Sequence, residues 1–382
     1  MDSSKIPNLN TLRTGRGRGG GLRGRALRSH QDVEVSKEAK DKIVQNTDQD
    51  AAQSRLSAVE LGYLDDPFAK AFVSERGPRR FPIINRGMLQ QLPIERTYVR
   101  TTAIDHLVHL FLSQSPSSPK QIISLGAGTD TRYFRLLHGN PSLQSTLIYH
   151  ELDFPSSTTS KIHTILTTPA LRSFLPSLTQ PTSLSPSDSS TLHTPNYNIH
   201  PLDLRTLTSP YSLPSLPNLR NDIPTLLLSE CCLIYLPPSL STSILRTFTQ
   251  HLLPTCPLSL ILYEPIRPHD PFGRTMVSNL LQRGIVLESL ETYAGIAEQK
   301  QRLRDVRLSD GVGGMDVLGV WKKWVGEGEK ERVGRCEMLD EVEEWELLAE
   351  HYCVCWGWRD GEDGDERGIF GEAWGGLEGR DG

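Results

Sequence analysis

The chain has 382 residues and a formal net charge of −5, a balance that argues against a nucleic-acid-binding or membrane-surface protein. Hydrophobic residues make up only 37% of the chain, while glycine and proline number 31 and 26, so part of the length is expected to lie outside a packed core. The sequence has no apolar run of about 18 residues and no signal-peptide pattern. The six cysteines match neither a zinc nor a disulfide spacing, so we expect a cytoplasmic protein with reduced thiols, no metal and no membrane partner.

Three segments have a biased composition. Two of them flank one predicted folded domain, and the third lies inside it. Residues 1–50 contain an Arg/Gly-rich stretch without acids, which is typical of a disordered tail without a specific nucleic-acid partner. Residues 359–382 mix glycine with acids and are interpreted as a second tail. The stretch from about 169 to 222 is dense in serine, threonine and proline, and predicts a surface insertion with one strand inside it. The domain itself would span residues 51–358.

The predicted elements of this domain alternate between helices and strands. Residues 51–112 have helical patterns in separable segments and predict a helical cap ahead of the first strand. Helical patterns at 243–253 and 272–284, the latter ending at Gly284 as a cap, separate the later strands. An acidic helix followed by a last strand is predicted within 338–358. This order predicts a doubly wound α/β domain with a mostly parallel sheet. Short, continuous apolar runs, typical of strands buried on both faces, lie at 122–126, 146–153, 197–204, 225–235 and 258–264.

A glycine turn, LGAGTDT, follows the first predicted strand. Asp153 ends the second strand, 25 residues beyond Gly128, a spacing that suits hydrogen bonds to a ribose diol. The third glycine of the dinucleotide fingerprint is missing, and Asp130 stands where a pyrophosphate would approach the helix. Acids also end other predicted strands, so the pattern favours a cationic nucleoside such as S-adenosylmethionine over a phosphate ligand. The remaining residues at strand ends are Gly126, Asp203, Glu230, Tyr263 and Glu264.

Other interpretations of these residues stay open at this point. A two-glycine turn after a strand is often only a tight turn, and Asp153 could simply cap the next helix. Glu230 could be solvated, although its apolar flanks favour burial. From the residues alone, a methyltransferase is the leading hypothesis, an NAD-type enzyme comes second, and a nonenzymatic α/β domain is the third.

Eight short motifs occur in a fixed order along the chain: GYLDDPF, INRG with TYVRTTAI, LGAGTDTRYFRL, HELDFP, LDLR, SECCLIYL, YEPIRPHDPFG and HYCVCW. Together they resemble the leucine carboxyl methyltransferase family, from about Arg55 to Trp356. Each motif alone is weak, whereas eight in order are specific. The resemblance implies a class I SAM-dependent methyltransferase fold, with a doubly wound, mostly parallel seven-stranded sheet, a helical N-terminal cap, and S-adenosylmethionine as the methyl donor. The segment 301–335 matches the family only loosely.

The resemblance also implies roles for seven residues in a cofactor site. Arg100 would hold the methionine carboxylate, a task suited to a two-pronged guanidinium. Gly126 would let the backbone approach the cofactor, and Asp153 would bind the ribose. The other implied contacts are Asp203 and Leu204 to adenine, Glu230 near the cofactor amino group or the sulfonium, and Arg55 as a basic contact.

The acceptor implied by the resemblance is the C-terminal leucine of the catalytic subunit of protein phosphatase 2A, whose α-carboxylate would become a methyl ester. A terminal carboxylate has an ordinary pKa of about 3.5 and is ionised at neutral pH, so no catalytic base is named and placement should dominate catalysis. One rival hypothesis is a related methyltransferase that acts on a wybutosine-type tRNA base or a small acid. Another is a silent α/β module that binds a partner through its tails. A monomer is expected by resemblance.

Overall fold

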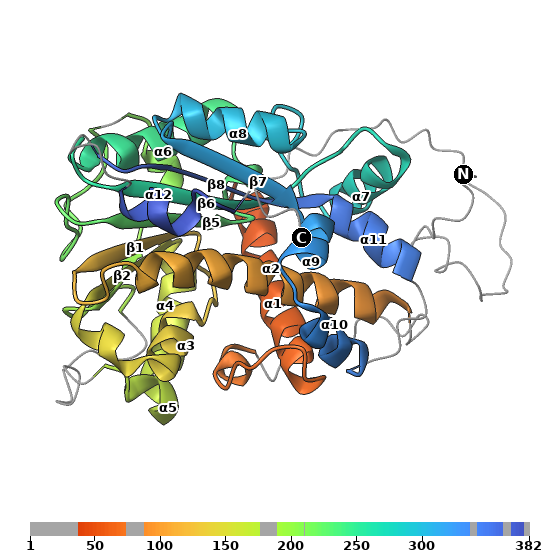
Figure 1. Cartoon of the computed structure of the whole chain (residues 1–382), viewed down its shortest axis with the longest axis horizontal. Coiled ribbons are helices and arrows are strands. Elements are labelled where there is room, and N and C mark those ends of the chain that lie inside the picture. Colours follow the sequence, from red (N-terminus) through yellow and green to blue (C-terminus); the bar gives the residue numbers. More distant parts are fainter. Residues whose placement is uncertain are drawn as a thin grey trace, which may run out of the picture.

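A central sheet with helices on both faces forms the body of the protein (Figure 1). The computed structural model describes residues 37–73, 88–175, 189–209, 211–336, 342–361 and 368–377. Within these residues the sheet has eight strands in the order β3-β4-β2-β1-β5-β6-β8-β7. The strands are β1 Lys120–Leu125, β2 Leu147–Asp153, β3 Leu192–His193, β4 Tyr197–Pro201, β5 Thr225–Glu230, β6 Leu258–Pro265, β7 Gly311–Asp316 and β8 Tyr352–Arg359.

The connections between the strands define where a ligand is expected to bind. Strand β1 pairs in parallel with β2 on one side and with β5 on the other. The chain runs outward from β1 through β2 to β4, then returns and continues from β5 to β6, so the strand order reverses between β1 and β5. Strand β8 lies antiparallel between β6 and β7. In open α/β sheets, ligands bind at such a reversal, beyond the carboxyl ends of the strands.

The predicted fold class is confirmed, with one strand more than expected. The order β4-β2-β1-β5-β6-β8-β7 gives the seven expected strands, and β3 adds two residues that pair antiparallel with β4 inside the predicted insertion of residues 169–222. The five strands predicted from apolar runs are all present. The strand predicted at 225–235 is shorter, because Cys231 has a φ of 49° and turns the chain out of the sheet after Glu230.

Strand β7 has no counterpart among the sequence predictions, because its sequence GVGGMD is poor in strand-forming residues. The neighbouring strand β8 explains the glycines. A Cβ atom at Gly311 would lie 2.1 Å from the ring of Trp358, and one at Gly313 would lie 2.2 Å from the ring of Trp356. The indole rings of β8 therefore occupy the space that side chains at Gly311 and Gly313 would need, so packing requires glycine at these two positions.

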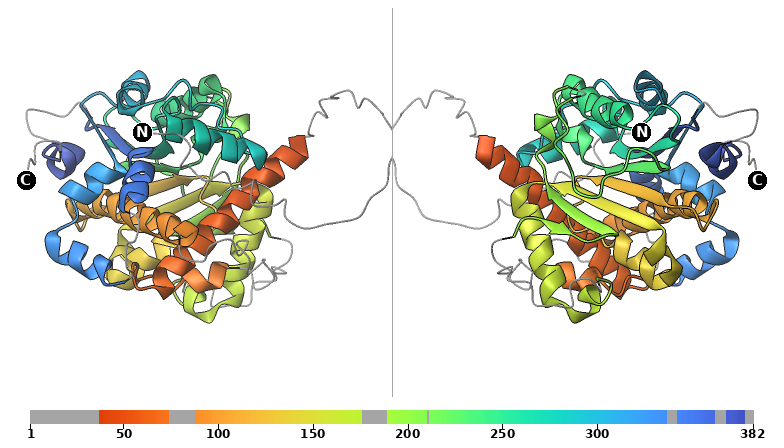
Figure 2. Two further views of the ribbon diagram at one scale, coloured as in Figure 1. Left: turned by 90° about the vertical axis from the view of Figure 1, so that its right-hand side faces the viewer. Right: turned by 90° about the vertical axis from the view of Figure 1, so that its left-hand side faces the viewer.

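Two predicted segment boundaries are wrong. The helical cap does not begin at residue 51, because α1 spans Lys37–Glu60 and thus takes in the last part of the segment predicted as a tail (Figure 2). The predicted C-terminal tail contains α12, Ile369–Trp374, whose Phe370 and Trp374 are buried. The Trp374 Nε1 donates a hydrogen bond to the carbonyl of Leu107, 3.1 Å away, which ties α12 to the body. The Arg/Gly-rich stretch lies outside the described residues, as do 176–188 of the insertion.

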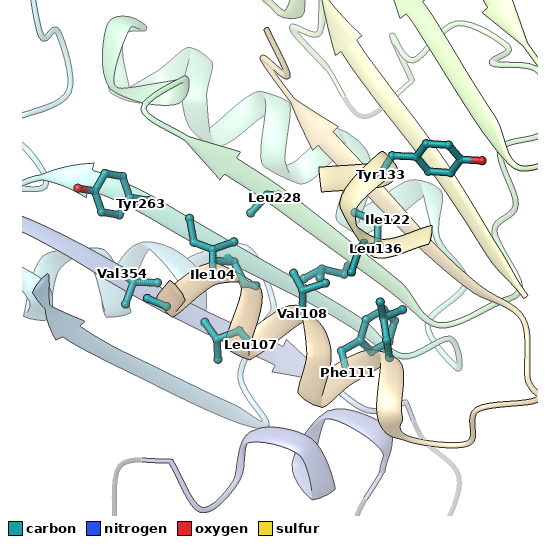
Figure 3. Close-up of a cluster of buried hydrophobic side chains, with 14 of the residues drawn as sticks. Ile104, Leu107, Val108, Phe111, Ile122, Tyr133, Leu136, Leu228, Tyr263 and Val354 are labelled. Carbon is teal, nitrogen blue, oxygen red and sulfur yellow. The ribbon is translucent and has the colours of Figure 1, made fainter. Parts of the chain in front are cut away.

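Two hydrophobic layers hold the helices against the sheet. On one face, α2 (Met88–Ser113) packs along its second half, and Figure 3 shows Ile104, Val108 and Phe111 of this helix next to Ile122 and Leu228 of the sheet. On the other face, α6 (Pro238–His251) and α8 (Ile296–Asp305) cover a second layer of aliphatic side chains. The remaining helices are α3 Arg132–Gly139, α4 Pro155–Thr167, α5 Pro169–Arg172, α7 Pro271–Gln282, α9 Val317–Lys323, α10 Glu327–Gly334 and α11 Val342–Glu350.

The end of α7 confirms the predicted glycine cap. Gly284 has a φ of +78°, and its N–H donates to the carbonyl of Leu281, 2.9 Å away. The next N–H, of Ile285, returns to the carbonyl of Leu280, 3.0 Å away, which satisfies carbonyls at the helix end. In the part of the chain that the structure describes, no helix combines the length and the apolar character needed to cross a membrane.

Candidate functional site

The glycine turn after β1 adopts a backbone that only glycine tolerates well. Gly126 and Gly128 have φ angles of +63° and +46°, in the left-handed region. A Cβ atom at Gly126 would lie 2.5 Å from the Cys232 Sγ, so a side chain there would collide with the segment after β5. The N–H of Gly126 donates to the carbonyl of Leu152 at 2.8 Å, which fixes the turn against the end of β2.

Asp153, at the end of β2, holds this turn from one side. Its Oδ2 accepts a hydrogen bond of 2.8 Å from the N–H of Gly128, and its Oδ1 accepts one of 2.6 Å from the N–H of Phe154. Burial raises the pKa of this carboxyl, while these hydrogen bonds oppose the shift. The N-cap position of α4 is Phe154, which has no side-chain cap, and the Asp153 carboxylate also interacts with the side chain of Ser157 in the first turn of this helix. Each carboxylate oxygen can accept a second hydrogen bond, which leaves capacity for a ligand hydroxyl.

Asp48 of α1 holds the same turn from the other side, and sequence reasoning placed this residue in a tail. Its Oδ1 accepts hydrogen bonds from both the N–H and the Oγ1 of Thr129, each 2.8 Å long. A Cβ atom at Gly128 would lie 2.3 Å from this oxygen. Burial raises the pKa of Asp48, and the nearby Asp153 adds to the shift. Two carboxylates thus bind N–H groups of the turn that a phosphate would need.

Arg132 joins the turn to the end of β5. Its side chain is fully buried, and its Nη1 lies 2.5 Å from the Asp130 Oδ2 and 2.8 Å from the Glu230 Oε1. Its Nε donates to the Oδ1 of Asp105 in α2, 3.0 Å away. Burial alone would lower the pKa of Arg132, but Asp130 and Glu230 outweigh it and raise the pKa. The family resemblance gave no role to Arg132. Its place in the sequence, two residues after Asp130, could have predicted an ion pair with that carboxylate.

Arg100 of α2 meets Glu230 from the opposite side. The Arg100 Nε lies 3.5 Å from the Glu230 Oε2, and its guanidinium lies 5.5 Å from the centre of the Tyr263 ring at the end of β6. The Nε is buried without a hydrogen-bond partner among the described residues. Both Arg100 and Glu230 are about one-sixth exposed, at 17% and 16% of the side chain. The side chains of Arg100 and Glu230 therefore lie together at the carboxyl end of β5.

Arg55 contacts this cluster less directly. Its Nη1 lies 3.3 Å from the Asp66 Oδ2, and its Nη2 lies 3.3 Å from the Thr101 Oγ1. Asp66 in turn accepts a hydrogen bond of 2.5 Å from the Thr131 Oγ1, next to the start of α3. Burial and the nearby Arg135 lower the pKa of Arg55. Two of its guanidinium nitrogens are thus engaged by the protein itself.

Asp203 and Leu204 follow β4, beside the end of β2. The N–H of Leu202 donates to the carbonyl of Asp153 at 2.9 Å, which brings the two strand ends together. The Asp203 carboxylate binds the guanidinium of Arg205, with the Arg205 Nη2 2.7 Å from its Oδ2. Leu204 is buried in the hydrophobic layer under α6, so its side chain packs in the core.

Among the acids that the sequence placed at the ends of strands, Glu264 lies apart from this group. Its side chain is completely buried on the face covered by α8, where its Oε2 lies 2.8 Å from the Arg302 Nη1 and 3.1 Å from the Gln299 Nε2. Alternation along β6 places Tyr263 on the opposite face, under Arg100. Gly126, Asp153 and Asp203 thus follow or end β1, β2 and β4, and Glu230 ends β5 with Arg100 of α2 beside it.

Comparison with known proteins finds relatives along the whole chain. A family model described as leucine carboxyl methyltransferase matches residues 43–249, a span that includes all seven predicted site residues. A protein of Aspergillus fumigatus named leucine carboxyl methyltransferase 1 is 48% identical over 408 aligned residues, which cover 100% of this chain and 100% of that protein. The chain belongs to the leucine carboxyl methyltransferase family. The protein is therefore a methyltransferase, and the family expected from the eight motifs is confirmed.

A second member of the family has a comparable identity to this chain. A leucine carboxyl methyltransferase 1 of Emericella nidulans is 51% identical over 383 residues, covering 94% of this chain and 96% of that protein. Among solved structures, phosphoethanolamine N-methyltransferase 2 of Haemonchus contortus with S-adenosyl-L-methionine matches with a TM-score of 0.38 and 10% identity over 71% of this chain and 58% of that one.

Proposed function

We propose that this enzyme transfers a methyl group from S-adenosylmethionine to the α-carboxylate of the C-terminal leucine of the protein phosphatase 2A catalytic subunit. The product would be a methyl ester. The observation that carries the proposal is the 48% identity, over the full length of both chains, to a protein named leucine carboxyl methyltransferase 1. The phosphatase is proposed from the motif resemblance, and the cytoplasm is proposed as the site of action.

The residues at the strand ends fit S-adenosylmethionine, which supplies a methyl group on a positively charged sulfur. The buried Arg100 Nε has no hydrogen-bond partner among the described residues, so this guanidinium can accommodate a carboxylate. Asp153 retains hydrogen-bonding capacity for the ribose hydroxyls, and Asp203 lies at the neighbouring strand end. Glu230 supplies negative charge at the end of β5 that would stabilise an ammonium or sulfonium group. Asp105 and Asp130 also bind Arg132 and so offset the positive charge beside Glu230.

The acceptor requires little acid–base chemistry from the protein. A terminal carboxylate with an ordinary pKa of about 3.5 is ionised at neutral pH and is itself the nucleophile. Holding two reactants in line can lower the barrier by about 7 kcal/mol or more, so positioning and exclusion of water account for the rate. We therefore assign no general base to the site. The residues of the site bind the cofactor and the acceptor and orient them for transfer.

A methyl-transfer assay with labelled cofactor tests this function. The unmodified phosphatase catalytic subunit should become labelled, and the label should be released by mild base, as expected of a carboxyl ester. Two matched acceptors serve as controls: the same subunit without its last leucine, and a C-terminal peptide ending in leucine amide. Labelling of these acceptors, or no labelling of the intact subunit by an enzyme that binds the cofactor, would contradict the proposed acceptor.

A further inference from the structure

The first half of α1, residues 38–50, differs from the second half in how it is attached to the body. Every residue from 38 to 50 keeps some exposure to solvent, and Asp48 is partly buried, whereas Ala52, Arg55 and Ala58 in the second half are buried. Figure 2 shows the first turns of α1 projecting beyond the body. A segment that is attached mainly by polar contacts and partly exposed side chains opens at a lower free energy than the core does.

One face of this half-helix makes polar contacts with the candidate site. Asp41, Gln45 and Asp48 lie four and three residues apart and therefore share a face. Asp48 accepts the two hydrogen bonds from Thr129 in the glycine turn. The Gln45 Oε1 accepts a hydrogen bond of 3.1 Å from the Ser156 Oγ in the first turn of α4.

Asp41 reaches the predicted adenine-contacting segment through Arg205. The Arg205 Nη1 and Nη2 donate to the two Asp41 oxygens at 2.6 and 2.8 Å, in a bidentate pair. The same guanidinium binds Asp203 and lies 5.1 Å from the centre of the Phe154 ring. Because Arg205 is shared by two carboxylates, Asp41 fixes the position of Asp203 without touching it.

A second face of the half-helix contacts the segment after β5 and the end of α7. Thr47 shares a side-chain hydrogen bond with Tyr235. Ile43 lies against Gly284, where an added Cβ atom would be 2.9 Å from the Ile43 Cδ1. Residues 38–50 therefore bridge the ends of β1, β2 and β4 on one side and the segment after β5 on the other, across the point where the strand order reverses.

We propose that residues 38–50 of α1 are a strap that closes over the cofactor site, and that Asp41 and Asp48 are its positioning residues. The inference rests on the proposed function, since it takes S-adenosylmethionine as the ligand. In the closed state Asp48 orders the glycine turn and Asp41 orders Asp203. Opening of the strap releases both and lets the cofactor exchange. Contacts made mainly by charged and polar groups suit such an element, because they break without exposing a core.

Hydrogen exchange of the unmodified enzyme gives the first test. Binding of S-adenosylhomocysteine should slow amide exchange in residues 38–50 more than in 52–60, because the second half is already held by buried side chains. This readout needs no variant, so it does not depend on the folding of an altered protein. Exchange in residues 38–50 that is unchanged by the bound nucleoside would overturn the strap.

The kinetics of binding give the second test. In the double variant Asp41→Ala with Asp48→Ala, dissociation of S-adenosylhomocysteine should be faster by about tenfold or more, and the exchange rate of residues 52–60 should be unchanged. Glu38→Ala is the matched control, because it removes one negative charge from an exposed position on the same helix. Its dissociation rate should equal that of the unmodified enzyme.

Two outcomes separate failure of the strap from failure of the proposed function. If the unmodified enzyme binds S-adenosylhomocysteine and the double variant releases it within twofold of the same rate, the strap is overturned and the function stands. If the unmodified enzyme binds neither S-adenosylmethionine nor S-adenosylhomocysteine, the proposed function is overturned and the strap with it.

Discussion

Two parts of the sheet contain closely spaced glycines for different physical reasons. After the carboxyl end of β1, Gly126 and Gly128 have positive φ angles, and the turn directs N–H groups to the carboxylates of Asp153 and Asp48. In β7, Gly311 and Gly313 lie in a regular strand, and the tryptophans of β8 occupy the space that side chains would need. The first set shapes a binding site and the second allows packing. Substitutions in the two regions should therefore separate binding from stability.

The largest expected effect falls on stability, at the β7–β8 pair. Gly313→Ala would place a methyl group 2.2 Å from the Trp356 ring, which is too close without movement of the strand. We expect the free energy of unfolding to fall by about 3 kcal/mol, measured by denaturant titration. Gly334→Ala is the control, since nothing lies within 4 Å of its added Cβ atom. Equal stability of the two variants would contradict the packing role of β7.

The next effect should fall on binding, at the other region. Arg100→Ala removes the guanidinium proposed to hold the methionine carboxylate, so the affinity for S-adenosylhomocysteine should fall by about a hundredfold. Calorimetry measures this directly. Arg246→Ala, at an exposed position of α6, should leave affinity unchanged. An Arg100→Ala enzyme with normal affinity would remove Arg100 from the cofactor site.

A smaller loss of affinity is expected at the ribose side. Asp153→Ala should weaken nucleoside binding by more than about tenfold, because it removes both the proposed ribose acceptor and the acceptor of the Gly128 N–H. Asp222→Ala, at a surface ion pair with Arg220, is the matched control and should have no effect on binding. Similar affinities of the two variants for the nucleoside would show that Asp153 and the glycine turn do not contribute to ligand binding.

The smallest expected effect is a pH dependence of the free energy of unfolding, and it arises in a third region, the paired strands β2 and β4. His150 and His200 are buried with their ring nitrogens 3.0 Å apart, and burial lowers the pKa of His150 to about 3 and of His200 to about 4. The unfolded chain binds protons near pH 6.5, whereas the folded protein does not until the pH is much lower. Stability should therefore be full above pH 6.5 and fall as the pH drops toward 4, by about 1 kcal/mol per pH unit for each imidazole.

Denaturant titrations at pH 7 and pH 5 measure this pH dependence. His200→Gln should reduce the difference in unfolding free energy between the two pH values. His163→Gln, at an exposed position on α4, should leave that difference unchanged. A difference that is the same in His200→Gln as in the unmodified enzyme would show that these imidazoles do not titrate on unfolding.

The sequence predicts the parts of this molecule whose cause is local. The turn at Gly126 and the strand before it are visible because positive φ angles demand glycine and buried parallel strands demand continuous apolar runs. Strand β7 is not predictable in this way, because its glycines are required by the packing of indole rings that lie more than 40 residues later in the chain. The roles of Asp48 and Arg132 also depend on contacts made only in the folded protein.

A crystal structure of the enzyme with S-adenosylhomocysteine tests the central claim most directly. We expect the methionine carboxylate to contact Arg100, the ribose hydroxyls to donate hydrogen bonds to Asp153, and the adenine to lie beside Asp203 and the Leu204 backbone. A nucleoside bound away from the ends of β1, β2 and β4, with Arg100 still paired only to Glu230, would contradict it.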